Sequence, residues 1–291
     1  MAKIGVFDSG YGGLTILRAI REVLPDYDYI YLGDNARAPY GTHSFDVIYR
    51  YTLQAVRFLL EQDCTLVILA CNTASAKALR TIQQKDLPLI NARRPENQKV
   101  NVLGVIRPTV EAVPAMTKNG HVGILATPAT VSSESYVLEL QKICLQPSAR
   151  AHSFCITQQP CPLWVPLIEA GEHTKPGADY FVDSYLRSLL DKDPLIDTLI
   201  LGCTHYPLIK GKIDAWMARE KKDGTLSVIS QGALVADSLA DYLSRHPEYR
   251  NRLSMNASCR FLTTENADRF SQSASIFLAE PVEAQQVILG S

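Results

Sequence analysis

The protein has 291 residues, a length that suggests one large or two medium domains. Hydrophobic residues make up 46% of the sequence and charged residues 20%, a composition typical of globular proteins. Its formal net charge of −1 argues against nucleic acids and anionic membranes as partners. No apolar run approaches the roughly 20 residues of a membrane span, and the N-terminal segment lacks signal-peptide features, so we expect a cytoplasmic protein that does not bind membranes.

Short apolar strands alternate with amphipathic helices from the N-terminus onward. Strands are expected at residues 3–7, 29–32 and 65–70. The third of these is apolar throughout, as buried parallel strands are. Helices with apolar residues at helical spacing are expected at residues 14–24, 45–60 and 73–82. This order predicts a parallel-sheet α/β domain.

A polar stretch at residues 91–99 interrupts the alternation and is interpreted as a linker or surface insertion. Further strands are expected at residues 102–106, 122–125, 153–156, 198–201, 226–229 and 260–263. Further helices are expected from about residue 109 and at 132–145, 209–219, 233–243 and 267–278. The predicted fold is α/β, with a first domain of residues 1–98 together with 209–291 and a second domain of residues 99–208.

Three loops that follow predicted strands carry unusual residues, and ligands of open α/β sheets bind at such strand ends. The first loop runs from Asp8 to Leu14 and holds three glycines, which let a backbone approach a ligand closely. No Lys-Ser/Thr pair follows the glycines, so a phosphate loop fits poorly. An ordinary strand-to-helix turn capped by Asp8 is an equally good interpretation of this loop alone.

The other two loops each place a cysteine between a buried strand and a helix. Short polar residues follow each cysteine: Asn72 and Thr73 follow Cys71, and Thr204 and His205 follow Cys203. The partial positive charge at a helix N-terminus favours the thiolate form of a cysteine. A single such cysteine would be read as buried and inert. Two of them in matching positions indicate a function.

Two such thiols could form a redox couple or a proton-transfer pair. Redox pairs usually lie in a Cys-x-x-Cys motif, which this sequence lacks. A racemase instead needs one base on each face of a planar carbanion, and two similar halves supply that arrangement. His205, two residues after Cys203, favours a proton-handling role. We find no convincing pyridoxal lysine at a strand end, so we expect no cofactor.

The seven cysteines are an odd number, which argues against a disulfide framework. Cys155 and Cys161 follow His152, which raises the question of a metal site. Their spacing matches no standard zinc pattern. The sequence therefore predicts no metal.

Residues 8–14, 33–34 with 39–41, 70–75 and 202–208, in this order, closely resemble the motifs of the glutamate racemase family. The resemblance implies a cytosolic enzyme that supplies D-glutamate for peptidoglycan, with two pseudo-symmetric α/β domains and the active site in the cleft between them. It also implies that Cys71 deprotonates D-glutamate and Cys203 deprotonates L-glutamate. Asp8 and His205 would bind the substrate and assist the thiol on their respective sides.

The same resemblance implies a set of substrate-binding residues. Ser9, Asn72, Thr73 and Thr204 would hold the polar ends of the amino acid, and the turn Pro39-Tyr40-Gly41 would offer backbone N–H groups to a carboxylate. Thr127 and Thr130 match the paired threonines of the family, and Glu169 matches its acidic residue near the site. Thr130 as a helix cap and Glu169 as a solvated helix residue are alternative interpretations.

The sequence departs from the family pattern at Arg107, at Ala126 and in the longer segment 91–99, which bears on the second domain and on regulation. The nearest alternative function is racemisation of a related substrate, such as aspartate or a hydantoin. A non-catalytic protein that binds an acidic metabolite is the alternative of a different class. A homodimer is left open by the sequence.

Overall fold

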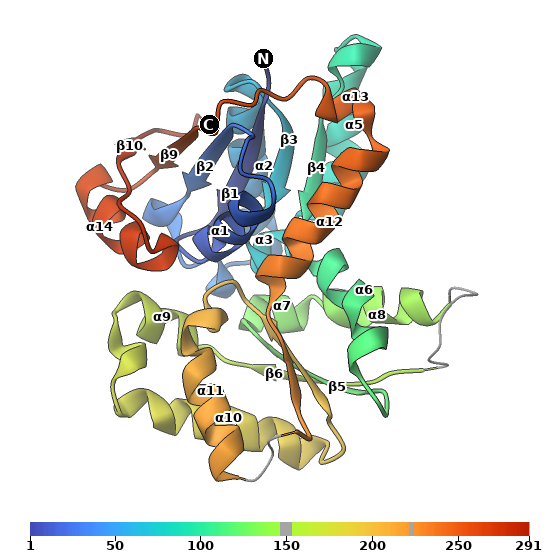
Figure 1. Ribbon diagram of the computed structural model, residues 1–291, viewed down its shortest axis with the longest axis vertical. Helices are drawn as coiled ribbons and strands as arrows, with labels where there is room; N and C mark the ends of the chain where they lie inside the picture. The colour runs from blue at the N-terminus through green and yellow to red at the C-terminus, as the bar shows by residue number, and fades with distance from the viewer. Residues whose placement is uncertain (146–152, 221–223, 291) are drawn as a thin grey trace. The chain divides into compact units, whose positions relative to one another are not determined.

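The computed structural model describes residues 1–145, 153–220 and 224–290 (Figure 1). These residues form two compact units, Met1–Val105 with Gly232–Ser291, and Ile106–Gln231. Each unit contains one sheet, and every strand pair within the two sheets is parallel. The prediction of two parallel-sheet α/β domains is confirmed.

The sheet of the first unit has the strand order β10-β9-β2-β1-β3-β4. Its strands are β1 (Lys3–Asp8), β2 (Tyr29–Gly33), β3 (Cys64–Leu69), β4 (Asn101–Gly104), β9 (Cys259–Thr263) and β10 (Ala284–Gln286). Every residue of β2 and β3 is buried, because helices cover both faces of the sheet (Figure 1).

The helices of the first unit follow the predicted order. They are α1 (Gly13–Val23), α2 (Phe45–Glu61), α3 (Asn72–Lys77), α4 (Leu79–Thr81), α5 (Leu87–Ala92), α12 (Gln231–Arg245), α13 (Pro247–Arg250) and α14 (Ala267–Leu278). In α1 the buried residues Leu14, Leu17 and Ile20 recur every three positions, which is the spacing that predicted it. A π-helical turn, Ile82–Asp86, joins α4 to α5, so the helical region extends beyond the expected residue 82.

The sheet of the second unit has the strand order β6-β5-β7-β8. Its strands are β5 (His121–Ala126), β6 (Cys155–Pro160), β7 (Thr198–Gly202) and β8 (Ser227–Ile229). Its helices are α6 (Ile106–Met116), α7 (Pro128–Ser132), α8 (Ser135–Cys144), α9 (Trp164–Glu169), α10 (Gly177–Lys192) and α11 (Lys210–Arg219). Gly123 of β5 lets α10 pack closely, since a Cβ atom there would lie 2.8 Å from Leu189 Cδ2.

Both unit boundaries lie later in the chain than residues 98 and 208, where the sequence placed them. β4 pairs with β3 and so belongs to the first sheet, although the expected strand at 102–106 was assigned to the second domain. β8 pairs with β7, which keeps the chain up to Gln231 in the second unit. Hydrogen bonding between strands far apart in the sequence, which the alternation of elements does not reveal, decides both boundaries.

The polar segment 91–99 is partly helical: α5 ends at Ala92, and a 3-10 turn covers Glu96–Gln98. The amide of Asn91 exchanges two hydrogen bonds with the backbone of Val100, at 3.0 and 2.9 Å, which closes the segment into a compact connection. Among the helices of the described ranges, none is long and apolar enough to cross a membrane.

Candidate active site

Cys71 lies between β3 and α3, in the first unit, and the residue is 5% exposed. The sulfur accepts a hydrogen bond from the Ala74 N–H at 3.4 Å and lies 3.3 Å from Ser9 Oγ. Phe7 pairs with Leu69, so the loops after β1 and β3 leave the same edge of the sheet. That register brings Ser9 to Cys71, and the buried residues Asn72 and Thr73 begin α3 beside them.

Asp8 ends β1 and is 1% exposed. Its Oδ2 accepts a hydrogen bond from the Gly10 N–H at 2.8 Å, which ties the carboxylate to the turn that carries Ser9. Gly13, the first residue of α1, lies directly against it, since a Cβ atom at Gly13 would lie 2.6 Å from Asp8 Cβ. At least one glycine of this loop is therefore required for close packing on the Asp8 side chain.

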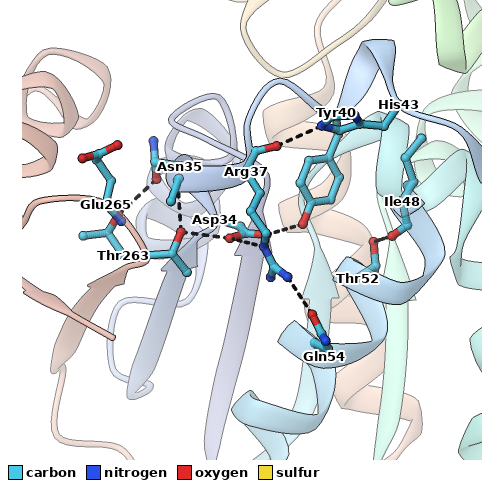
Figure 2. A network of polar contacts seen from close by, with 12 residues as sticks. Asp34, Asn35, Arg37, Tyr40, His43, Ile48, Thr52, Gln54, Thr263 and Glu265 are labelled. Carbon is cyan, nitrogen blue, oxygen red and sulfur yellow. Dashed lines mark hydrogen bonds and ion pairs between the residues drawn. The ribbon is translucent and has the colours of Figure 1, made fainter. Parts of the chain in front are cut away.

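The turn Pro39-Tyr40-Gly41 is held by a buried carboxylate, that of Asp34 (Figure 2). Asp34 accepts a short hydrogen bond from the Tyr40 hydroxyl, two from Arg37 Nε at 2.9 and 2.7 Å, and one from Thr264 Oγ1 at 2.9 Å. Burial and the neighbouring Asp34 charge raise the pKa of Tyr40 far above its usual value. The phenol thus anchors the turn.

Cys203 follows β7 in the second unit and is 6% exposed. His205 lies between this cysteine and Glu169 at the end of α9: its Nδ1 is 3.8 Å from Cys203 Sγ, and its Nε2 is 2.9 Å from Glu169 Oε1. Burial alone would lower the pKa of His205, but the interactions with Cys203 and Glu169 raise it to about 10. Glu169 is therefore a partner of His205, although it is also an exposed residue at the end of its helix.

Thr127 and Thr130 meet at the end of β5, with their hydroxyl oxygens 3.0 Å apart. Thr127, rather than Thr130, caps α7, because its Oγ1 accepts the Thr130 N–H at 3.3 Å. Ala126, the last residue of β5, pairs with Gly202, the last residue of β7. Thr127 and Cys203 therefore both lie at the same edge of the sheet. Thr204, next to Cys203, is 3% exposed.

The structure adds a second cysteine to this edge, beside Cys203. Ala126 also pairs with Pro160, the last residue of β6, so Cys161 follows β6 as Cys203 follows β7. Burial and the nearby Cys203 raise the pKa of Cys161 well above its usual value. The expected strand ended at residue 156, which hid this position. A strand extended to the Gln158-Gln159-Pro160 run would have revealed it.

Cys155 and Cys161 do not form a metal site with each other. They stand at opposite ends of the six-residue strand β6, which rises about 3.3 Å per residue. They therefore cannot bind one ion together. His152, the third member of that group, lies outside the described residues.

The arrangement at these strand ends can be compared with known proteins. The model of the Asp/Glu/hydantoin racemase family matches residues 14–236 of the chain. The chain belongs to this family. It is 40% identical over 289 residues to a glutamate racemase of Paracoccus denitrificans, covering 96% of this chain and 97% of that protein. It is also 40% identical over 291 residues to a glutamate racemase of Roseobacter denitrificans, covering 97% and 98%.

Solved structures agree with these relatives. The crystal structure of a glutamate racemase from Francisella tularensis in complex with D-glutamate has a TM-score of 0.80 and 33% identity, covering 99% of this chain and 98% of that one. A glutamate racemase isoform from Bacillus anthracis has a TM-score of 0.83 and 29% identity, with the same coverage. The resemblance that the sequence motifs indicated is confirmed.

Proposed function

We propose that this protein interconverts L- and D-glutamate without a cofactor, using Cys71 and Cys203 as its two bases. One observation supports this most directly. In each unit a buried cysteine follows a parallel strand, with a polar side chain at its sulfur: Ser9 at Cys71 and His205 at Cys203. The relatives named above are glutamate racemases that match nearly the whole chain.

The reaction requires two groups because the Cα proton leaves from one face and returns on the other. With D-glutamate, the Cys71 thiolate takes the Cα proton and the Cys203 thiol donates its own proton to the opposite face, giving L-glutamate. With L-glutamate, the roles are exchanged. Each turnover leaves one thiol protonated and the other ionised, the reverse of the starting state, so the reverse reaction or proton exchange with water restores it.

In the second unit, His205 is proposed to control the proton of Cys203. With a pKa of about 10, its imidazole is protonated at neutral pH, and Glu169 balances that charge. The cation beside the sulfur favours the thiolate, the form that acts as a base. Glu169 contacts His205 and is therefore proposed to position the ring and maintain its charge.

In the first unit, Ser9 and the Ala74 N–H are proposed to stabilise the Cys71 thiolate by hydrogen bonding. Asp8, held in the same turn by Gly10, is proposed to assist proton transfer at Cys71. These donors are fixed before substrate arrives, so no reorganisation is needed as charge develops.

The remaining polar residues at these strand ends are proposed to bind the substrate. They are Asn72, Thr73, Thr127, Thr130 and Thr204, together with the backbone of the turn Pro39-Tyr40-Gly41. As the family resemblance implies, we also propose a cytoplasmic enzyme that supplies D-glutamate for peptidoglycan. A homodimer stays a prediction, which light scattering of the purified protein would test.

The decisive experiment is circular dichroism of each enantiomer of glutamate and aspartate with protein dialysed against a chelator and treated with a carbonyl-trapping reagent. We expect both glutamate enantiomers to racemise and, in D₂O, the product to carry deuterium at Cα. Faster turnover of aspartate would favour the related racemase. Binding of glutamate without turnover would favour the non-catalytic binding protein.

A further inference from the structure

A second group of reactive side chains lies at the opposite end of the sheet in the second unit. His121 is the first residue of β5, and Cys155 is the first residue of β6. The two are direct partners in the register of these strands. Asp193 follows the last residue of α10. One nitrogen, one sulfur and one oxygen from these three side chains all lie within 4.8 Å of one another.

The aspartate connects the other two side chains. Its Oδ2 lies 2.8 Å from His121 Nδ1, and its carboxylate accepts a hydrogen bond from the Cys155 thiol. Cys155 is exposed and the His121 side chain is 25% exposed, so the cluster opens to solvent on one side. An ion could reach all three ligand atoms without any opening of the core.

We propose that His121, Cys155 and Asp193 bind one Zn²⁺ ion, at a site separate from the racemase residues. Zinc takes sulfur at about 2.3 Å, imidazole nitrogen at about 2.0–2.1 Å and carboxylate oxygen at about 2.0–2.2 Å, in tetrahedral geometry. Such ligand atoms lie about 3.3–3.6 Å apart, so small side-chain rotations suffice. The fourth position faces solvent and takes a water molecule.

The donor set selects zinc among the common divalent ions. Mg²⁺ and Ca²⁺ prefer shells of oxygen atoms, and this cluster offers one carboxylate beside a sulfur and a nitrogen. Thiolate and imidazole are the ligands that zinc prefers. Binding releases the proton of the Cys155 thiol to solvent, and the His121 ring binds through Nδ1 in its neutral form, with its proton on Nε2.

The ligands are held by hydrogen bonds that metal binding leaves intact. Asp193 Oδ1 accepts the Leu195 N–H at 3.0 Å. The backbone of His121 is fixed on both sides, by Asn119 Oδ1 at 2.9 Å and by the Asp197 N–H at 3.1 Å. Outer hydrogen bonds of this kind orient ligands and support affinity. Zinc would join β5, β6 and the end of α10 at one point.

Cobalt is a suitable probe, because a cysteine ligand gives Co²⁺ a sulfur-to-metal charge-transfer absorption. We expect metal-free protein to bind one Co²⁺ with this absorption, and Zn²⁺ to displace it. The Cys155→Ser variant should lose the absorption, and His121→Gln and Asp193→Asn should each bind at least about tenfold more weakly. Cys144→Ser, which removes a cysteine outside the cluster, should behave as the wild type does.

Thermal unfolding supplies a second readout. Zn²⁺ should raise the Tm of the wild type and of Cys144→Ser, and leave that of Cys155→Ser and His121→Gln unchanged. Retention of the cobalt absorption by Cys155→Ser, or an equal rise in Tm with Zn²⁺ for all four proteins, would overturn the proposed zinc site. So would the lack of a one-to-one complex with the wild type. Racemase activity should be unchanged in Cys155→Ser, so failure of the metal site and failure of the proposed function are distinguishable.

Discussion

His205 joins Glu169 to Cys203, with its Nε2 2.9 Å from the carboxylate and its Nδ1 3.8 Å from the sulfur. The pKa of a buried imidazole normally falls, yet that of His205 rises to about 10 because two partners favour its charged form. In the first unit the groups at the Cys71 sulfur include a hydroxyl and a backbone N–H. The two cysteines therefore have different electrostatic environments, although they occupy equivalent strand ends.

Replacing Glu169 with Gln removes the charge that supports the protonated ring. We expect the pKa of His205 to fall by about 1–3 units, the range for loss of one close opposite charge. Titration of the imidazole by NMR in wild type and variant would measure the change. Glu172→Gln, which affects an exposed ion pair with Lys175, is the matched control and should leave the pKa of His205 unaltered. An equal pKa in all three proteins would contradict the role of Glu169.

Replacing either proposed base with alanine should stop racemisation in both directions, because every turnover uses both thiols. We expect Cys71→Ala and Cys203→Ala each to lower kcat by about 10²- to 10⁴-fold or more, the contribution of a positioned acid or base. Cys144→Ala is the control for loss of a thiol elsewhere. Circular dichroism measures both the activity and the fold. Near-normal turnover by either folded variant would refute the two-thiol mechanism.

Asp28 contributes to the free energy of unfolding, and this contribution should decrease at acid pH. This carboxylate is 3% exposed and accepts hydrogen bonds from Asn256 Nδ2 at 2.6 Å and Ser258 Oγ at 2.7 Å. Burial would raise the pKa of Asp28, but these and further hydrogen bonds hold it well below its usual range. A depressed folded-state pKa stabilises the protein above the unfolded value of about 3.9, and this stabilisation is lost as the pH falls further.

The Asp28→Asn variant should therefore lose about 2 kcal/mol of unfolding free energy at pH 7, the scale of hydrogen bonds to a charged group. At pH 2–3 the difference from the wild type should shrink, because the wild-type carboxylate is then close to protonated in the unfolded state. Urea unfolding at several pH values measures this. Asp26→Asn, two residues earlier, is the control. A difference independent of pH would argue against the charge of Asp28.

Local patterns in the sequence predicted most elements, because their apolar residues recur at the spacing of one strand or helix. β3 and α1 are clear examples. The 16-residue α10 was missed, although Ala178, Val182, Leu186 and Leu189 form its buried stripe. The places of β4 and β8 depend on pairing with distant strands. Asp193 was missed because only the folded chain brings it to His121 and Cys155. Cys161 was missed at its strand end because the expected strand stopped at residue 156, short of Pro160.

Each of the two cysteines should serve one direction of proton abstraction. Asp8 lies in the turn that contacts Cys71 through Ser9, and His205 contacts Cys203. A substitution of Asp8 or of His205 should therefore slow proton abstraction from one enantiomer more than from the other. The equilibrium fixes the ratio of the two kcat/KM values, so these ratios cannot reveal the asymmetry. The separate kcat values and the primary deuterium isotope effects can, because they depend on how far proton abstraction limits each direction.

We expect Asp8→Asn to raise the isotope effect mainly with α-deuterated D-glutamate, and His205→Asn mainly with the L enantiomer. The reason is that each substitution slows abstraction by the neighbouring thiolate, which makes that step more rate-limiting. Glu172→Gln serves as the control and should leave both isotope effects unchanged. Equal isotope effects from the two enantiomers in both variants would refute the assignment of Cys71 to the D-proton, while the two-base reaction itself would still stand on the cysteine variants.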